Sequence, residues 1–221
     1  MRIDRLMDIM ALLVGVAAIV LMVDVVWNRS SVRAANGKEH NVEVPDWRQY
    51  IAQGRTLGPA TAPVTILEFG DYECPACRHF HGTLEAVMAA FGDSVTVVYR
   101  HFPLERHLLG QTAARAAECA ADQGRFVPYH NLLYENSSWL ALGSRAFELY
   151  ARGVGVPDSA RFAECLFSLD DMKSLSSDWD AGLALGVQGT PTIMVNDLLL
   201  GGVPDSATLS GLVREALDAT N

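Results

Sequence analysis

Two cysteines separated by two residues, Cys74 and Cys77, have the clearest capacity for chemistry in this sequence. They follow an apolar run that ends at Gly70 and precede a helical pattern. Unpaired backbone N–H groups and the helix dipole stabilise a thiolate at a helix N-terminus, so we expect a low pKa for Cys74. Pro75 suits the first helical turn, which needs no N–H. Cys77 lies one turn further on and is the natural thiol to resolve a mixed disulfide.

The same pair has two other interpretations. Zinc could bind Cys74, Cys77 and His81, which share a helical face, but a fourth ligand and usually a second paired motif would be needed. An inert local disulfide would close so small a loop that it would constrain the unfolded chain very little. We favour the redox interpretation, because a CxxC at the strand-to-helix turn of a βαβ unit is typical of redox motifs.

The elements that must position this pair can be predicted from apolar periodicity and from breaker residues. Strands are expected at 63–70 and 94–104, with a helix between them that begins at the cysteines and ends at Gly92. Residues 106–186 have helical patterns without a convincing strand. Two strands at 192–196 and 198–202, joined through Asn196-Asp197, and a final helix over 205–219 follow. The predicted order is βαβ, a helical insertion, then ββα.

The N-terminal part of the chain predicts export. Residues 9–27 are almost entirely apolar, follow Arg2 and Arg5, and at about 1.5 Å per residue approach the thickness of a bilayer core. We favour a retained single-pass anchor over a signal peptide cleaved after Ala34. In either case we expect the catalytic domain on the extracytoplasmic, periplasmic side.

The predicted domain organisation has six parts. They are a cytoplasmic N-terminus (1–8), a transmembrane anchor or uncleaved signal (9–27), a tether (28–56), a first core segment (57–105), the helical insertion (106–186) and a second core segment (187–221).

Composition excludes some classes of function. The formal net charge of −9 over 221 residues argues against a nucleic-acid surface, because phosphate binding needs clustered Lys and Arg. Four cysteines are too few for a disulfide-scaffold protein of this length. Cys119 and Cys165 lie in two predicted helices, and we hypothesise a structural disulfide between them, with two buried thiols as the alternative.

At four stretches the sequence resembles DsbA-like thiol:disulfide oxidoreductases, which have a thioredoxin fold with an inserted helical domain. The four stretches are "PVTILEFGDYECPACRHF", "YRHFPL", "HLLGQTAARAAECA" and "LGVQGTPTIMVN". The resemblance covers about residues 57–219. It implies a cis Thr190-Pro191 peptide bond facing the cysteines, with the Thr190 backbone and Pro75 among the groups that meet a substrate polypeptide.

The resemblance also matches Glu68 with a buried acid of the family. A carboxylate in an apolar strand is costly without a task, so Glu68 is expected to have a raised pKa and to move a proton for Cys77. The alternative is that Glu68 faces solvent on an edge strand. Ala76 departs from the family, because strongly oxidising members carry His there. A disulfide-forming oxidase is therefore our first expectation, with a reductase or isomerase as the alternative.

The resemblance implies no dissociable cofactor, because electrons pass through the disulfide itself. Expected partners are cysteine-containing exported polypeptides and a membrane redox protein that resets the pair. A protein of another class, which binds or delivers metal through the CxxC, is a further alternative. The other residues considered as metal ligands are His79, His81, His101 and His107. We predict no metal site at these histidines and interpret most of them as helix-surface or groove residues.

Overall fold

A computed structural model describes residues 41–220 of the chain. The predicted cytoplasmic N-terminus (1–8), the anchor or signal (9–27) and the first part of the tether lie outside the described residues. Within residues 41–220, none of the helices has the length and apolarity needed to cross a membrane.

The described residues contain one sheet of six strands in the order β1-β6-β5-β3-β4-β2. The only parallel neighbours in it are β3 and β4, and the other pairs are antiparallel. The strand bounds are Val42–Glu43 (β1), Arg55–Leu57 (β2), Val64–Gly70 (β3), Val95–His101 (β4), Thr192–Val195 (β5) and Leu198–Leu199 (β6).

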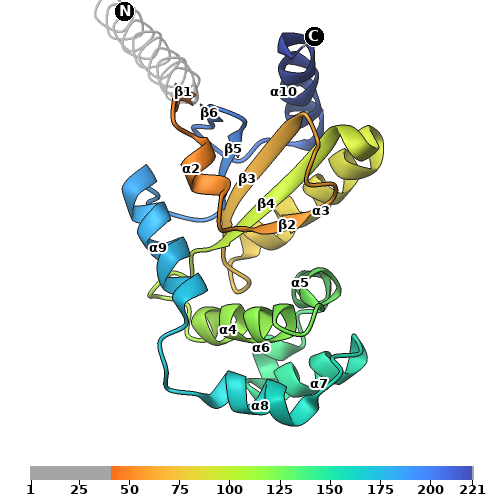
Figure 1. Cartoon of the computed structure of the whole chain (residues 1–221), viewed down its shortest axis with the longest axis vertical. Helices are drawn as coiled ribbons and strands as arrows, with labels where there is room; N and C mark the ends of the chain where they lie inside the picture. Colours follow the sequence, from red (N-terminus) through yellow and green to blue (C-terminus); the bar gives the residue numbers. More distant parts are fainter. Residues whose placement is uncertain (1–40, 221) are drawn as a thin grey trace, which may run out of the picture. The chain divides into compact units, whose positions relative to one another are not determined.

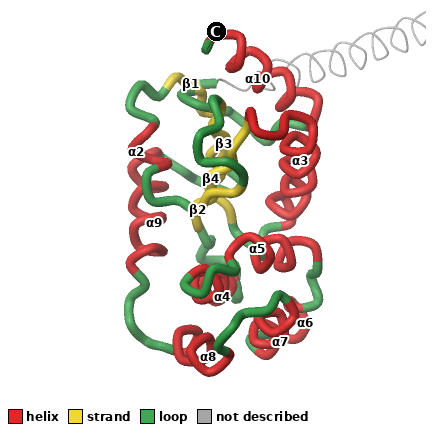
Figure 2. Tube along the Cα trace, turned by 45° about the vertical axis from the view of Figure 1, so that its right-hand side comes forward, coloured by secondary structure: helices red, strands yellow, loops and turns green. Residues whose placement is uncertain are grey.

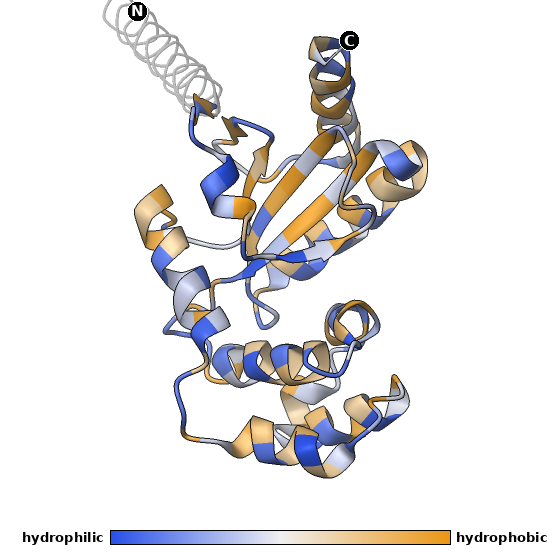
Figure 3. Cartoon of the chain, viewed as in Figure 1, coloured by the Kyte–Doolittle hydropathy of each residue, from blue (hydrophilic) through white to orange (hydrophobic). Residues whose placement is uncertain are grey.

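The two long central strands are buried because helices cover both faces of the sheet. Every residue of β3 and β4 is buried, as expected for parallel strands joined by a crossover helix. On one face lie α3 (Pro75–Phe91) and α10 (Ser206–Ala219), and on the other α2 (Arg48–Ile51) and α9 (Lys173–Leu185), as Figure 2 shows edge-on. The apolar residues of the central strands, visible in Figure 3, therefore contribute to two cores.

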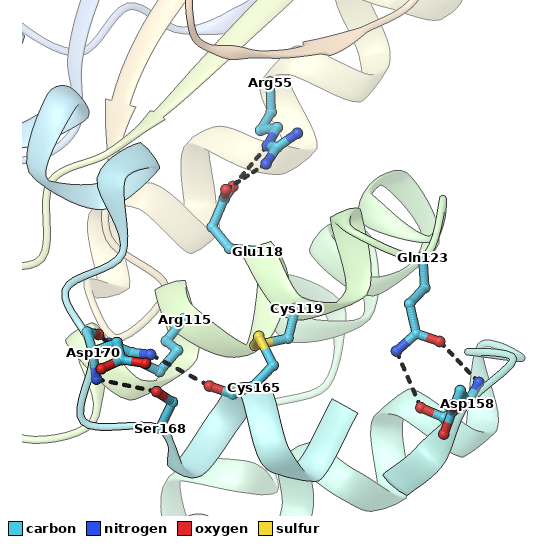
Figure 4. The surroundings of a disulfide bond; sticks show 9 residues. All are labelled: Arg55, Arg115, Glu118, Cys119, Gln123, Asp158, Cys165, Ser168 and Asp170. Atoms are coloured by element: carbon cyan, nitrogen blue, oxygen red, sulfur yellow. Dashed lines mark hydrogen bonds and ion pairs between the residues drawn. A yellow bond between two sulfur atoms is a disulfide. The ribbon is translucent and has the colours of Figure 1, made fainter. Parts of the chain in front are cut away.

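A second group of helices lies beyond one end of the sheet (Figure 1). It contains α4 (Gly110–Ala121), α5 (Phe126–Glu135), α6 (Trp139–Leu142), α7 (Arg145–Gly153) and α8 (Ser159–Phe167). A disulfide joins Cys119 of α4 to Cys165 of α8, with a Cα–Cα distance of 5.8 Å (Figure 4). The predicted thioredoxin-type order with a helical insertion is confirmed.

Residues 41–56 differ from the prediction of a tether. In this range β1 pairs with β6 and β2 pairs with β4, so the segment adds a strand at each edge of the sheet. Trp47 is buried in the core beside α9, and the Arg55 guanidinium donates to the Glu118 carboxylate at 2.7 Å (Figure 4). Prolines, glycines and polar residues are common both in linkers and in short edge strands. The sequence therefore predicts a linker where the structure has two edge strands.

The boundary of the insertion also differs from the prediction. Helix α9, which we placed in the insertion, packs on the sheet, where Trp179 stacks on Phe102 with ring centroids 4.3 Å apart. Gly182 lies so close to Phe102 that a Cβ atom there would come within 2.5 Å of the ring. A helical pattern alone does not show which layer a helix covers.

The predicted hairpin at Asn196-Asp197 is confirmed. Asn196 has a positive φ of 49°, a conformation that Asn tolerates in tight turns. Its side-chain oxygen accepts a hydrogen bond of 2.9 Å from the Thr65 backbone N–H of β3. The turn is therefore tied to the central strand, which holds the β5 strand and the loop before it in place.

Candidate active site

The two cysteines lie where β3 passes into α3. Cys74 is the N-cap residue with extended backbone angles, φ −72° and ψ 121°, and Pro75 begins the helix. Cys77 is fully buried and Cys74 is 4% exposed. Both are free thiols in the structure. The pair therefore has the predicted arrangement of one thiol at the helix N-terminus and a second one turn deeper.

A distant loop completes the site. The Thr190-Pro191 peptide bond is cis, and the Cys74 thiol donates a hydrogen bond of 3.3 Å to the Thr190 backbone carbonyl. Thr190 and Cys74 are 116 residues apart in the chain. A groove of about 400 Å³ runs along this loop and is lined by residues 185–192, Leu199 and Leu200.

The surroundings lower the pKa of the Cys74 thiol and raise the pKa of the Cys77 thiol. The hydrogen bond from Cys77 lowers the pKa of Cys74 to about 5, against the opposing effect of burial, and the backbone N–H groups of Cys77 and Ala76 lower it further. Burial raises the pKa of Cys77, as do its hydrogen bond to Cys74 and the charge of Glu68. Cys74 is therefore the thiolate at neutral pH and Cys77 the protonated thiol.

We predict that alkylation of Cys74 in the reduced protein follows a titration with a midpoint near pH 5, not near the ordinary value of 9.0. The measurement is the rate of iodoacetamide modification against pH, followed by mass analysis. A Cys77→Ala variant should have a higher midpoint, because alanine removes the hydrogen bond that Cys77 donates to Cys74. Since the folded-state pKa of Cys74 is depressed, the contribution of Cys74 to the stability of the reduced protein should increase as pH rises from about 5 to 9. A wild-type midpoint above pH 8 would contradict the prediction.

Glu68 lies in the middle of the sheet and not on an edge. It pairs with Tyr99 of β4 on one side and with Ile193 of β5 on the other, and it is 1% exposed. Its Oε1 atom has no hydrogen-bond partner among the described residues. Burial, assisted by the negative charge of Cys74, raises the pKa of Glu68 to about 8. The structure therefore contradicts the alternative of a solvent-facing edge residue.

Asp71 is a buried acid of this region that the sequence analysis missed. Its carboxylate accepts hydrogen bonds from the backbone N–H groups of Glu73 and Leu104 and from Nδ1 of His107, at 2.9, 2.8 and 2.6 Å. The backbone carbonyl of Asp71 accepts from the Cys74 N–H at 3.0 Å. Asp71 therefore joins the turn before Cys74 to the loop after β4. An aspartate in a turn is so common that no local signal distinguishes it.

A cluster of rings behind the cysteines was also missed. The hydroxyl of Tyr72 and Nδ1 of His130 share a hydrogen bond of 2.9 Å, and the hydroxyls of Tyr99 and Tyr134 share one of 2.8 Å. All four residues are buried. They come from the β3–α3 turn, β4 and α5, so only the packing of the helical group against the sheet end brings them together.

The interpretation of most of the histidines as helix-surface or groove residues is wrong for two of them. His81 is 6% exposed and His101 is 1% exposed. The Nε2 atom of His101 lies 3.0 Å from a Glu118 carboxylate oxygen, within the network that includes Arg55. Both positions lie where packing of the helical group against the end of the sheet excludes water, which the local sequence does not show.

A comparison with known families identifies this fold. A thioredoxin family model matches residues 51–215, which is most of the chain. The chain belongs to the thioredoxin family. The match includes both cysteines, the cis-proline loop and the helical insertion between them.

Two solved structures refine the family assignment. A thioredoxin-like oxidoreductase from Silicibacter pomeroyi DSS-3 is 27% identical, with a TM-score of 0.67 over 77% of this chain and 98% of that one. DsbA2 from Pseudomonas aeruginosa is 26% identical, with a TM-score of 0.56 over 75% of this chain and 93% of that one. The predicted resemblance to DsbA-like proteins is confirmed.

Curated relatives of this thioredoxin-family chain include longer proteins. One is the Na(+)/H(+) antiporter NhaA 1 of Mycolicibacterium gilvum (strain PYR-GCK), which is 35% identical over 153 residues. The match covers 69% of this chain and 25% of the antiporter. The chain thus spans about a quarter of the length of the curated relatives it matches.

Proposed function

We propose that this protein oxidises cysteine pairs of exported polypeptides outside the cytoplasm, with Cys74 and Cys77 as the exchanging pair. A substrate thiolate attacks Cys74 Sγ of the oxidised pair, the Cys74–Cys77 bond breaks, and a mixed disulfide forms. The second substrate thiolate then attacks the substrate sulfur and releases Cys74 as a thiolate. Two electrons pass to the cysteine pair. One substrate proton ends on Cys77 and the other goes to solvent.

The observation that carries this proposal is the contact between the Cys74 thiol and the Thr190 carbonyl beside the cis Pro191. The reacting sulfur thus lies next to the partly exposed backbone of Gly189 and Thr190 and beside the groove along residues 185–192. An extended polypeptide could pair with this backbone as an added strand while its cysteine meets Cys74. In this proposal Thr190, Pro191 and Pro75 contact the substrate.

The acidity of Cys74 favours the oxidising direction. A thiolate that is stable at neutral pH stabilises the reduced pair and is a good leaving group from a mixed disulfide. Ala76 favours the alternative of a reductase or isomerase, because its exposed methyl group adds neither charge nor hydrogen bond to that thiolate.

The decisive experiment equilibrates the Cys74–Cys77 pair against a series of glutathione redox buffers. We expect a potential markedly above that of thioredoxin, about −270 mV. A value near thioredoxin's would reverse the proposed direction and support the reductase alternative. An Ala76→His variant is the matched comparison, and we expect it to be more oxidising than the wild type.

The location and the partners are also part of the proposal. Stable disulfides are typical of oxidising compartments, and the Cys119–Cys165 bond is one. The predicted apolar segment 9–27 would anchor the domain at the membrane. A membrane redox protein would then accept the two electrons and restore the Cys74–Cys77 disulfide.

We propose that Glu68 transfers the proton of Cys77. A Glu68→Gln variant should then exchange about a hundredfold more slowly near neutral pH, because the amide can neither deliver that proton to Cys77 nor take it back. The same substitution should also change how stability depends on pH. Ionisation of Glu68 costs stability as pH rises from 4.5 to about 8, the ordinary and folded-state pKa values of Glu68, and the variant should lack this contribution.

Stopped-flow exchange rates and denaturant unfolding at several pH values measure the two effects of Glu68→Gln. Glu73→Gln is the control, since Glu73 lies near the pair but accepts a hydrogen bond from the Leu109 N–H instead. Equal exchange rates for wild type and Glu68→Gln at all pH values would exclude the proton-transfer role.

A further inference from the structure

Three side chains that the exchange reaction does not use converge between α3 and α5. His81 and Glu85 lie one turn apart on α3, and Glu135 is the last residue of α5. One ligand atom from each of them lies within 4.8 Å of the other two. The His81 Nε2 atom is 3.9 Å from Glu85 Oε1. An imidazole nitrogen and two carboxylates are thus directed at one point.

The histidine nitrogen in this cluster lacks a partner. The side chain of His81 is 93% buried, its relative exposure being 7%, and its Nε2 atom has no hydrogen-bond partner among the described residues. Packing holds the ring in place, because it stacks on Tyr134 at 5.0 Å and meets His130 edge-on at 5.4 Å. A buried polar atom without a partner is costly, so a ligand at this atom would remove a cost of the fold.

The two glutamates also lack a counter-charge. Within residues 41–220, no lysine or arginine forms an ion pair with Glu85 or Glu135. The cluster therefore has two carboxylates and no compensating positive charge among the described residues.

An opening leads to the cluster. A cavity of about 230 Å³ between α3, α5 and the segment after β2 is lined by His81 and Glu85. Glu85 is 51% exposed and Glu135 is exposed as well. The carboxylates are therefore free to adjust around an ion, whereas the imidazole is already held in position.

We propose that His81, Glu85 and Glu135 bind a divalent transition-metal ion, with Zn²⁺ the best match. One imidazole nitrogen and carboxylate oxygens suit zinc, at about 2.0–2.2 Å from each ligand, and His and Glu four residues apart on a helix can share one ion. Tetrahedral coordination at these lengths needs ligand atoms about 3.4 Å apart, so the carboxylates must move inward from their present separations. Water would occupy the fourth position.

The ion would connect two parts of the fold. Helix α3 carries Cys74 and Cys77 at its start, and α5 belongs to the helical group beyond the sheet. A metal bound only by the folded chain would stabilise it and raise its melting temperature. This site is separate from the proposed exchange reaction, since it uses neither thiol.

The test is calorimetric titration of the full chain with ZnCl₂ after treatment with a chelator. The protein is kept oxidised, because free thiols at Cys74 and Cys77 would bind zinc themselves. We expect one equivalent of zinc to bind. Glu85→Gln and Glu135→Gln should each weaken zinc binding at least about tenfold, because loss of a ligand should cost more affinity than loss of a residue that only supports a ligand. Both changes are at exposed positions, and circular dichroism verifies the fold.

Glu164→Gln is the matched control, because Glu164 is an exposed glutamate on α8 whose change alters the charge equally. It should leave the affinity unchanged. The proposal is overturned if the oxidised wild type binds no stoichiometric zinc, or if Glu164→Gln weakens binding as much as Glu85→Gln. Equal affinity for Ca²⁺ would also overturn it, since calcium does not select an imidazole ligand.

Discussion

A Cys74→Ser variant is expected to lose disulfide exchange by at least about a thousandfold, as removal of a catalytic nucleophile does in other enzymes. The thiolate is the reactive species, and a serine hydroxyl in the same place neither ionises near neutral pH nor forms a disulfide. Cys77 cannot replace Cys74, because it is fully buried and its pKa is raised by burial. The measurement is the rate of oxidation of a peptide with two cysteines.

The companion Cys77→Ser variant should fail differently. Its Cys74 thiolate can attack a peptide whose single cysteine is bound to glutathione, so that glutathione leaves as a thiolate and a Cys74–peptide disulfide forms. In the wild type Cys77 attacks Cys74 Sγ and releases the peptide, whereas no thiol at position 77 resolves the adduct in the variant, so the adduct should accumulate. Mass analysis before and after reduction detects this adduct. Ala76→Ser is the control, because it introduces a hydroxyl into the same turn and keeps both thiols.

These variants also separate the enzyme from the alternative of a metal-delivery protein. That alternative requires tight, stoichiometric metal in the reduced wild type and no exchange with the peptide. If Cys74→Ser exchanged disulfides at the wild-type rate, Cys74 would not be the nucleophile. If no adduct formed in Cys77→Ser, the assigned order of the two thiols would be wrong.

Removal of the second disulfide should have the largest effect on stability. The Cys119–Cys165 bond closes a loop of 46 residues, and the chain-entropy model gives a loss of about 4 kcal/mol in the free energy of unfolding for a loop of this length. A double Cys119→Ala, Cys165→Ala variant should show this loss in denaturant unfolding followed by circular dichroism. Exchange through Cys74 and Cys77 should persist below the unfolding transition.

The control for this prediction is the wild type with all disulfides reduced. It should be destabilised by a similar amount, because the entropic effect depends on the bond and not on the sulfur atoms. A smaller loss in the double variant than in the reduced wild type would point to Cys74–Cys77 as the stabilising bond. Unchanged stability in both would contradict the prediction.

The elements nearest the cysteines could be predicted because their signals are local. The β-branched run before Gly70, the proline after Cys74 and the glycine at 92 mark a strand, a helix start and a helix end within one stretch of chain. Burial of Glu68 could be anticipated in part, since a single acid in an otherwise apolar strand is conspicuous. The roles of these residues remain proposals for the experiments above.

The segment before the core and the last helix of the insertion could not be placed in this way. Polar, glycine-containing sequence serves equally for a linker and for a short edge strand, so β1 and β2 have no distinctive pattern. For α9, the periodicity predicts a helix but not that Trp179 lies on Phe102, the residue that follows β4. Both depend on which surfaces other segments leave uncovered.

By itself, the sequence determined the pair of thiols, their position at a helix start and the order of elements around them, because backbone preferences and helix polarity act over a few residues. Only the tertiary structure decided that Thr190 meets Cys74, that rings from three elements pack together, and that Glu135 joins His81 and Glu85. These contacts join residues far apart in the chain. They arise from the packing of whole helices on the sheet, and no single residue in the sequence indicates how the helices will pack.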